Sequence, residues 1–180
     1  MISLRRLAPI VFTAAIAISG CNNSPDLKKE EALQIINREM NYPREVNYEI
    51  FCSDPYHAKR LIDAGLETEG FVTVQKTQKL KNIGKPLVQF MEKAKPYLLP
   101  VSDKEKALDV QKVKIAVEEI AGIDMYKDSN EGKTQLVVYT TVYKNATPFA
   151  RLIKEDLTGA REHRAYFKLA DKEWVLEKYK

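Results

Sequence analysis

The chain has few of the residues that carry enzyme or metal chemistry. Its 180 residues include two histidines and two cysteines, and the histidines, His57 and His163, are far apart in the sequence. It has no glycine-rich phosphate loop, no Gly-x-Ser-x-Gly nucleophile elbow and no His-Glu-x-x-His metal helix. Because metal sites need several ligands at fixed spacings, we expect no metal site, no cofactor and no catalytic residues.

Cys52 is expected to be a buried core residue. It ends a segment, residues 45–52, in which apolar side chains alternate as in a strand with one buried face. A nucleophilic cysteine needs an exposed, electropositive setting, so a thiolate pair between Cys52 and His57 is the weaker interpretation. A reactive or intermolecular thiol is the remaining alternative.

Two pairs of glutamates, Glu67/Glu69 and Glu118/Glu119, have the side chain that acid–base catalysis requires. The chain has 25 acidic residues, so pairs of this kind arise by chance. We therefore expect all four carboxylates to be solvated surface groups.

The charges are numerous and nearly balanced. The chain has 29 basic and 25 acidic side chains, and without residues 1–20, which contain Arg5 and Arg6, the net charge is +2. A nucleic-acid-binding domain usually has a clear basic excess. We expect no nucleic acid among the partners.

A long apolar run occurs only near the amino terminus. Arg5 and Arg6 precede the apolar residues 7–18, and two small residues then lead into Cys21. This is the three-part pattern of a secretory signal, and the run is well short of the roughly 20 residues needed to span a membrane. Residues 1–20 are therefore predicted to be a signal peptide.

The segment Ile18-Ser19-Gly20-Cys21 resembles the lipobox of bacterial lipoproteins, which has an aliphatic residue, two small residues and a cysteine. In that family the cysteine thiol receives a diacylglycerol, the signal is cut just before it, and the new amino terminus is usually acylated. The resemblance implies lipid attachment at Cys21 and a lipidated tether over residues 21–25. An ordinary secretory signal with a chance cysteine is the alternative.

Asn22 and Asn23 follow the lipobox cysteine. In enteric-type sorting, an aspartate at the second mature position would resemble an inner-membrane retention signal, and here it is absent. For a Gram-negative source we expect the periplasmic face of the outer membrane. Each buried methylene contributes about 0.8 kcal/mol, so two or three acyl chains would make the membrane a stable partner.

Residues 26–100 are predicted to form a helix and hairpin module that loosely resembles a winged helix. Its expected elements are a helix capped at Ser24 with Pro25 as its first residue, a strand over 45–52, a helix from Pro55 to Gly65, and a hairpin of strands 70–78 and 87–93 with a turn at 82–86. Pro96 and Pro100 suggest a break after this module.

Residues 101–180 are predicted to form an antiparallel sheet with one short helix. The expected elements are a helical turn at 104–110, strands over 111–121 (extending towards 126), 133–144, 163–170 and 173–179, a polar turn at 128–132, and a helix over 147–156. The class is α+β. The layout is similar to cystatin-type or NTF2-type small sheets, a likeness that implies no function.

Two groups of side chains are candidates for a contact surface. The first comprises the lysines around the hairpin tip: Lys76, Lys79, Lys81 and Lys85. Near an anionic surface each lysine contributes about 1 kcal/mol, although lysines on hairpin edges also prevent edge-to-edge sheet pairing. The second is Tyr139 with Tyr143, which form either an aromatic patch for a partner or a layer packed under the helix over 147–156.

The expected function is that of a lipid-anchored cell-envelope protein, a non-enzymatic binding or scaffold module that faces the periplasm. It would contact a protein or an envelope polymer in addition to the membrane. One alternative is an enzyme that modifies envelope polymers through an unrecognised site. Another is an immunity or inhibitor protein.

Overall fold

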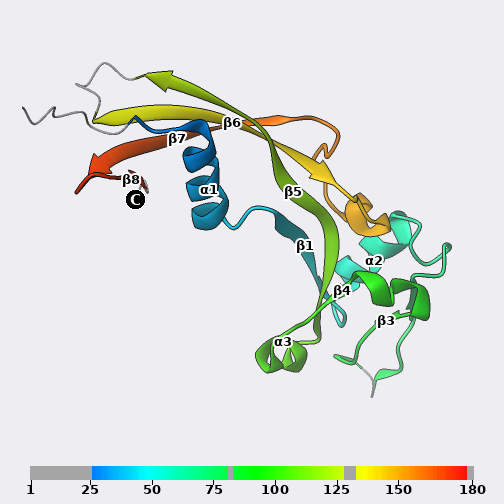
Figure 1. Ribbon diagram of the computed structural model, residues 1–180. Coiled ribbons are helices and arrows are strands. Elements are labelled where there is room, and N and C mark those ends of the chain that lie inside the picture. Colours follow the sequence, from blue (N-terminus) through cyan, green and yellow to red (C-terminus); the bar gives the residue numbers. More distant parts are fainter. Residues whose placement is uncertain (1–25, 81–82, 128–132, 178–180) are drawn as a thin grey trace, which may run out of the picture.

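The computed structural model describes residues 26–80, 83–127 and 133–177. A curled antiparallel sheet runs through the molecule, with helices packed against it (Figure 1). The expected α+β class is confirmed. The signal peptide, the lipobox, the tether, Lys81 and the predicted turn at 128–132 lie outside the described residues.

The main sheet is built around β5 (Val110–Lys127). Its strand order is β1 (Arg44–Phe51), β5, β6 (Thr134–Lys144), β7 (Arg161–Ala170) and β8 (Glu173–Leu176), all antiparallel. The short β4 (Leu98–Leu99) also pairs with β5. Strand β5 is shifted in register at Val46/Asn47 of β1 and at its own Ile120/Gly122. Such bulges bend a strand and increase its twist, which explains the curl.

The second helix, α2 (Pro55–Asp63), has the boundaries that its sequence predicts. Asp54 caps it, since its Oδ1 accepts a hydrogen bond from the Tyr56 backbone N–H at 2.7 Å. Gly65, at φ +74°, then takes the left-handed conformation that ends the helical segment.

The first helix, α1 (Lys29–Met40), begins later than predicted. Residues 26–28 are not helical and Lys28 occupies the N-cap position, so the predicted cap at Ser24 was wrong. Leu27 is 6% exposed and packs in the core just before the helix starts. The helix therefore begins only after Leu27 has entered the core, and the capping signals in the local sequence did not predict this position.

The predicted hairpin is present, with shorter strands. Strand β2 (Val72–Val74) pairs with β3 (Val88–Phe90), and a 3₁₀ helix, η2 (Glu92–Tyr97), follows directly. The predicted helical turn at 104–110 is the shorter α3 (Asp103–Ala107), which has a capping box between Ser102 and Glu105. The predicted helix over 147–156 is the shorter 3₁₀ helix η3 (Pro148–Leu152).

Two hydrophobic cores lie along β5. The first joins the initial half of β5 to β1, α2, the hairpin and η3; its fully buried members include Ile50, Leu61, Leu66, Val113, Ile115 and Phe149. The second joins α1 to the remaining half of β5 and to β6, β7 and β8; its members include Ile36, Ile123, Val137, Tyr139, Phe167 and Trp174. Both predicted modules, 26–100 and 101–180, therefore contribute to one sheet and to both cores.

Replacing Phe149 or Phe167 by alanine is expected to lower the free energy of unfolding by about 3–5 kcal/mol, because each ring is fully buried in one core. Since β5 belongs to both cores, each variant should unfold in a single transition at a lower urea concentration than the unsubstituted protein. Circular dichroism measures this transition. Val175→Ala, at an exposed position, is the control with little change. Two separate transitions would contradict this coupling of the cores.

Candidate functional site

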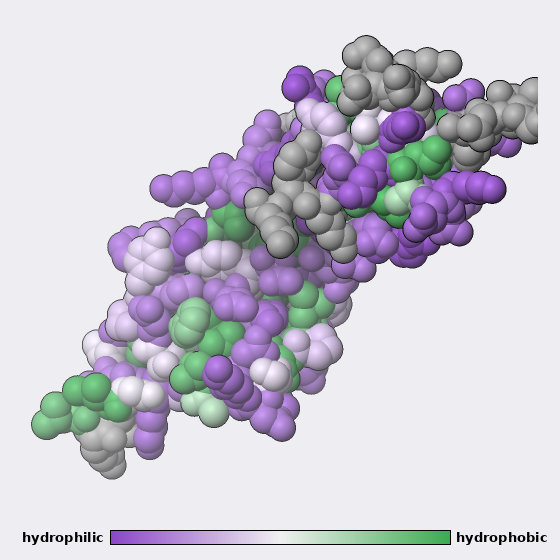
Figure 2. Space-filling view, turned by 90° about the vertical axis from the view of Figure 1, so that its left-hand side faces the viewer, coloured by the Kyte–Doolittle hydropathy of each residue, from purple (hydrophilic) through white to green (hydrophobic). Residues whose placement is uncertain are grey.

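The described parts of the hairpin connection, residues 75–80 and 83–87, lie at one end of the molecule, away from the half of the sheet on which α1 packs (Figure 1). We call the described part of this connection, residues 75–80 and 83–87, the hairpin loop. Apolar side chains protrude at this end of the space-filling view (Figure 2). Leu87 packs against the first core, whereas Leu80 and Ile83 of the loop are exposed to solvent.

The two arms of the hairpin loop are fixed by hydrogen bonds. The Gln75 backbone N–H donates to the Leu87 carbonyl at 2.8 Å, and Gln78 Nε2 donates to the Lys85 carbonyl at 3.0 Å. The Leu87 N–H also donates to the Cys52 carbonyl at 2.7 Å, which ties the returning arm to the end of β1. The loop is thus positioned by the first core rather than by its own sequence alone.

The hairpin loop is basic and apolar. Leu80 and Ile83 are 86% and 69% exposed, the highest values among the large hydrophobic side chains of the described residues. Lys76, Lys79 and Lys85 are also exposed, and residues 70–91 contain four lysines and no aspartate or glutamate. We predicted the lysines but missed the two aliphatic side chains between them. The sequence could have shown them, because both aliphatic side chains lie among lysines in a stretch without acidic residues.

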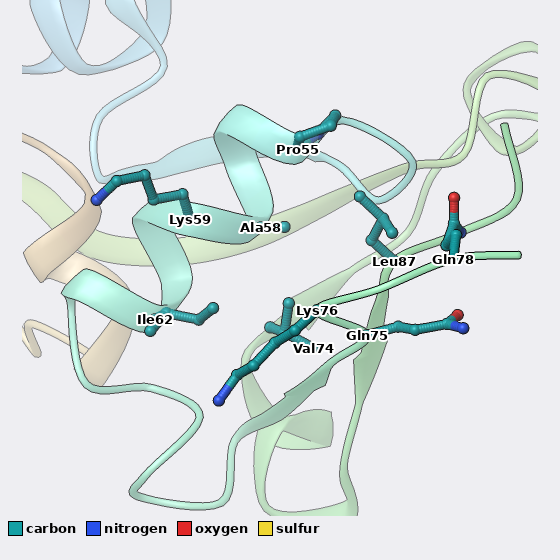
Figure 3. Close-up of a pocket in the computed structure, with 9 residues that line it drawn as sticks. All are labelled: Pro55, Ala58, Lys59, Ile62, Val74, Gln75, Lys76, Gln78 and Leu87. Carbon is teal, nitrogen blue, oxygen red and sulfur yellow. The ribbon is translucent and has the colours of Figure 1, made fainter. Parts of the chain in front are cut away.

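A groove of about 340 Å³ lies between α2 and the hairpin (Figure 3). Its apolar lining residues are Ala58, Ile62, Val74 and Leu87, and its polar ones include Lys59, Lys76, Gln75 and Gln78. Lys59 Nζ lies 2.6 Å from Asp63 Oδ2, and Lys76 Nζ lies 3.3 Å from Glu67 Oε2. The groove therefore has apolar walls and a mouth in which two lysines are partly neutralised.

The two candidate tyrosines do not form an exposed patch. Tyr139 is 4% exposed in the second core, where its ring meets Tyr42 edge-on at a centroid distance of 6.1 Å. Tyr143 is partly buried against the first core, beneath the Arg161 guanidinium. Tyr139 packs in the core that contains α1 and not under residues 147–156, so the contact surface is reduced to the lysines.

A buried polar network lies between the two cores, and the prediction that Glu118 is a solvated group was wrong. Glu118 is 1% exposed, and side chains of both neighbouring strands, Arg44 of β1 and Thr141 of β6, contact its carboxylate. Its Oε2 accepts from Arg44 Nε at 2.7 Å, and its Oε1 accepts from Thr141 Oγ1 at 2.8 Å. Both carboxylate oxygens are therefore bound by the protein.

The same network orients His163. Thr141 Oγ1 lies 2.9 Å from His163 Nε2. Because the single hydroxyl hydrogen of Thr141 is donated to Glu118, Nε2 must donate its own hydrogen to Thr141. The His163 ring stacks on Tyr139 at a centroid distance of 5.0 Å. Tyr42, which meets Tyr139 edge-on, lies beside the same network. Burial, with Tyr139 and Glu118 nearby, raises the pKa of its hydroxyl. These contacts stabilise the place where the two cores meet.

The other acidic residues considered as catalytic pairs make ion pairs. Glu119 pairs with Lys144, and Glu69 accepts from Arg151 through both carboxylate oxygens, at 2.6 and 2.9 Å. Glu67 accepts from the Val74 backbone N–H at 3.1 Å. Each of these carboxylates thus helps to hold two elements together.

Cys52 and His57 occupy different surroundings. Cys52 is 8% exposed in the first core, which confirms the prediction of a buried residue. His57 lies among the rings of Tyr48, Phe51 and Tyr56 at centroid distances of 5.3–5.8 Å. Burial lowers the pKa of His57, and its Nδ1 has no hydrogen-bond partner among the described residues. This packing favours a neutral ring.

No family model, no curated protein and no solved structure matches the chain. Within residues 26–80, 83–127 and 133–177, no helix is long and apolar enough to cross a membrane. The same ranges contain no group of three or more histidine, cysteine, aspartate or glutamate side chains that could hold a metal ion.

Glu118→Ala is expected to cost about 1–3 kcal/mol of unfolding free energy, because it leaves the buried hydroxyl of Thr141 without its acceptor and removes the partner of the half-exposed Arg44. The neighbouring Glu119→Ala removes a surface ion pair and should cost less than about 1 kcal/mol. Urea unfolding of the two variants measures the difference. Equal losses would contradict the assignment of Glu118 to a buried network.

The Cys52 thiol is expected to react slowly with a disulfide reagent in the native protein at pH 8 and rapidly after unfolding. Burial, with Asp109 nearby, raises its pKa from the usual 9.0 to about 11. Folding therefore favours the neutral thiol. Its contribution to stability is complete below pH 9 and is lost as the pH rises towards 11. Fast native labelling at pH 8 would contradict this.

Proposed function

We propose that this protein is a lipid-anchored binding module of the cell envelope. The lipobox supports attachment through Cys21, and Asn22 supports the periplasmic face of the outer membrane in a Gram-negative cell. The folded part, with its nearly balanced charge, would act close to that surface as a non-enzymatic module.

The observation that carries the binding proposal is the hairpin loop. It combines exposed lysines with the two most exposed large apolar side chains of the described residues, Leu80 and Ile83. Leaving such side chains in water is unfavourable, so a partner that covers them gains apolar burial and electrostatic attraction together. We also propose that the helix and hairpin module over residues 26–100 loosely resembles a winged helix. The sheet of residues 101–180 would resemble cystatin-type or NTF2-type sheets.

A binding role is also favoured by the use of the acidic side chains. The most buried carboxylate, Glu118, has both oxygens occupied by Arg44 and Thr141. A general acid or base must instead reach a proton of the substrate. We therefore consider an enzyme that modifies envelope polymers a weaker candidate function than a binding module.

Replacing Cys21 by alanine is expected to abolish incorporation of radioactive palmitate in growing cells and to leave an uncut precursor, since the proposed lipid is carried by that sulfur. Cys52→Ala is the matched control, because this cysteine lies in the core, and its variant should be labelled and processed normally. Normal labelling of the Cys21→Ala variant would rule out the anchor.

A further inference from the structure

We propose that the hairpin loop docks on the anionic surface of the membrane that holds the lipid anchor, with Leu80 and Ile83 inserted at the level of the headgroups. The proposal rests on the anchor at Cys21. It adds a second contact, made by the folded domain itself, and so specifies the partner of the candidate surface.

The composition of the loop fits a membrane interface. Aliphatic side chains insert into the boundary between headgroups and acyl chains, while lysines extend along the surface to anionic headgroups. Lys76, Lys79 and Lys85 are exposed beside Leu80 and Ile83. The stretch 70–91 contains no carboxylate that would repel an anionic surface. Lys76 is ion-paired with Glu67, so Lys79 and Lys85 supply most of the attraction to anionic headgroups.

The shape of the loop favours lipid over a folded protein. Apolar side chains protrude as a narrow tip at one end of the space-filling view (Figure 2), and Leu80 and Ile83 are only two exposed side chains, whereas a stable protein interface usually buries about 800 Å² on each partner. A tip of this kind can enter a bilayer, which deforms around it. The apolar groove lies between α2 and the hairpin and is not lined by Leu80 or Ile83. Insertion of these two side chains into a membrane therefore does not require the groove.

The anchor explains why a small contact would suffice and why it would form on the same membrane. The 18 residues of β5 extend over about 60 Å at the usual rise of a strand, and this strand runs along the molecule (Figure 1). The five-residue tether reaches at most about 17 Å. A molecule held this close can tilt until its far end meets the bilayer. The second contact then becomes an intramolecular event at high effective concentration.

Fluorescence quenching in vesicles tests the proposal. The lipidated full-length protein is reconstituted into anionic vesicles whose lipids carry a nitroxide quencher in the acyl chains. An environment-sensitive fluorophore is attached in a Cys52→Ala background at Leu80→Cys or, as the matched control, at Leu108→Cys, an exposed leucine that follows α3. We expect loss of fluorescence at position 80 and none at position 108. The loss should weaken in zwitterionic vesicles, at high salt, and in the double variant Lys79→Gln/Lys85→Gln.

The possible failures are distinguishable. If the protein does not float with the vesicles, the anchor fails and the proposed function fails with it. If it floats but position 80 is quenched no more than position 108, the anchor stands and membrane docking by the loop is overturned. Quenching at position 80 only when the nitroxide is in a second, protein-free vesicle population would place the loop on an opposing membrane and overturn docking on the anchoring one.

Discussion

The pairing of β5 with β1 on one edge and with β4 and β6 on the other holds the described chain together. The first half of this strand carries one core and the second half carries the other. Where the cores meet, Glu118 is enclosed from both edges, and Arg44 and Thr141 supply the hydrogen bonds that a buried carboxylate requires. The bulges bend the sheet, and α2, η2 and η3 pack on one half of it while α1 packs on the other.

This arrangement separates the two ends of the molecule. Helix α1, which follows the tether, packs on the half of the sheet that contains β6, β7 and β8, and the hairpin loop lies at the far end of the other half (Figure 1). The first core holds the loop through the hydrogen bond from Leu87 to the Cys52 carbonyl. Leu80 and Ile83 are therefore exposed on a loop that the first core holds in place, and docking on the membrane is the separate proposal made for them.

Local sequence signals were sufficient where an element depends on its own residues. Asp54, Pro55 and Gly65 defined α2, and alternation defined β6. They failed where the outcome depends on distant segments. Glu118 was expected in solvent because nothing adjacent indicates that β1 and β6 enclose it. Alternation puts Tyr139 and its neighbour Val138 on opposite faces of β6, but it does not say which face α1 covers.

The most direct test of this account is photo-crosslinking in intact cells from position 80 of the full-length protein. A photoreactive residue at Leu80 should yield adducts with membrane lipid, identified by mass spectrometry, whereas the same residue at Leu108 should not. Adducts from Leu80 with a protein or with peptidoglycan and none with lipid would contradict membrane docking by the hairpin loop.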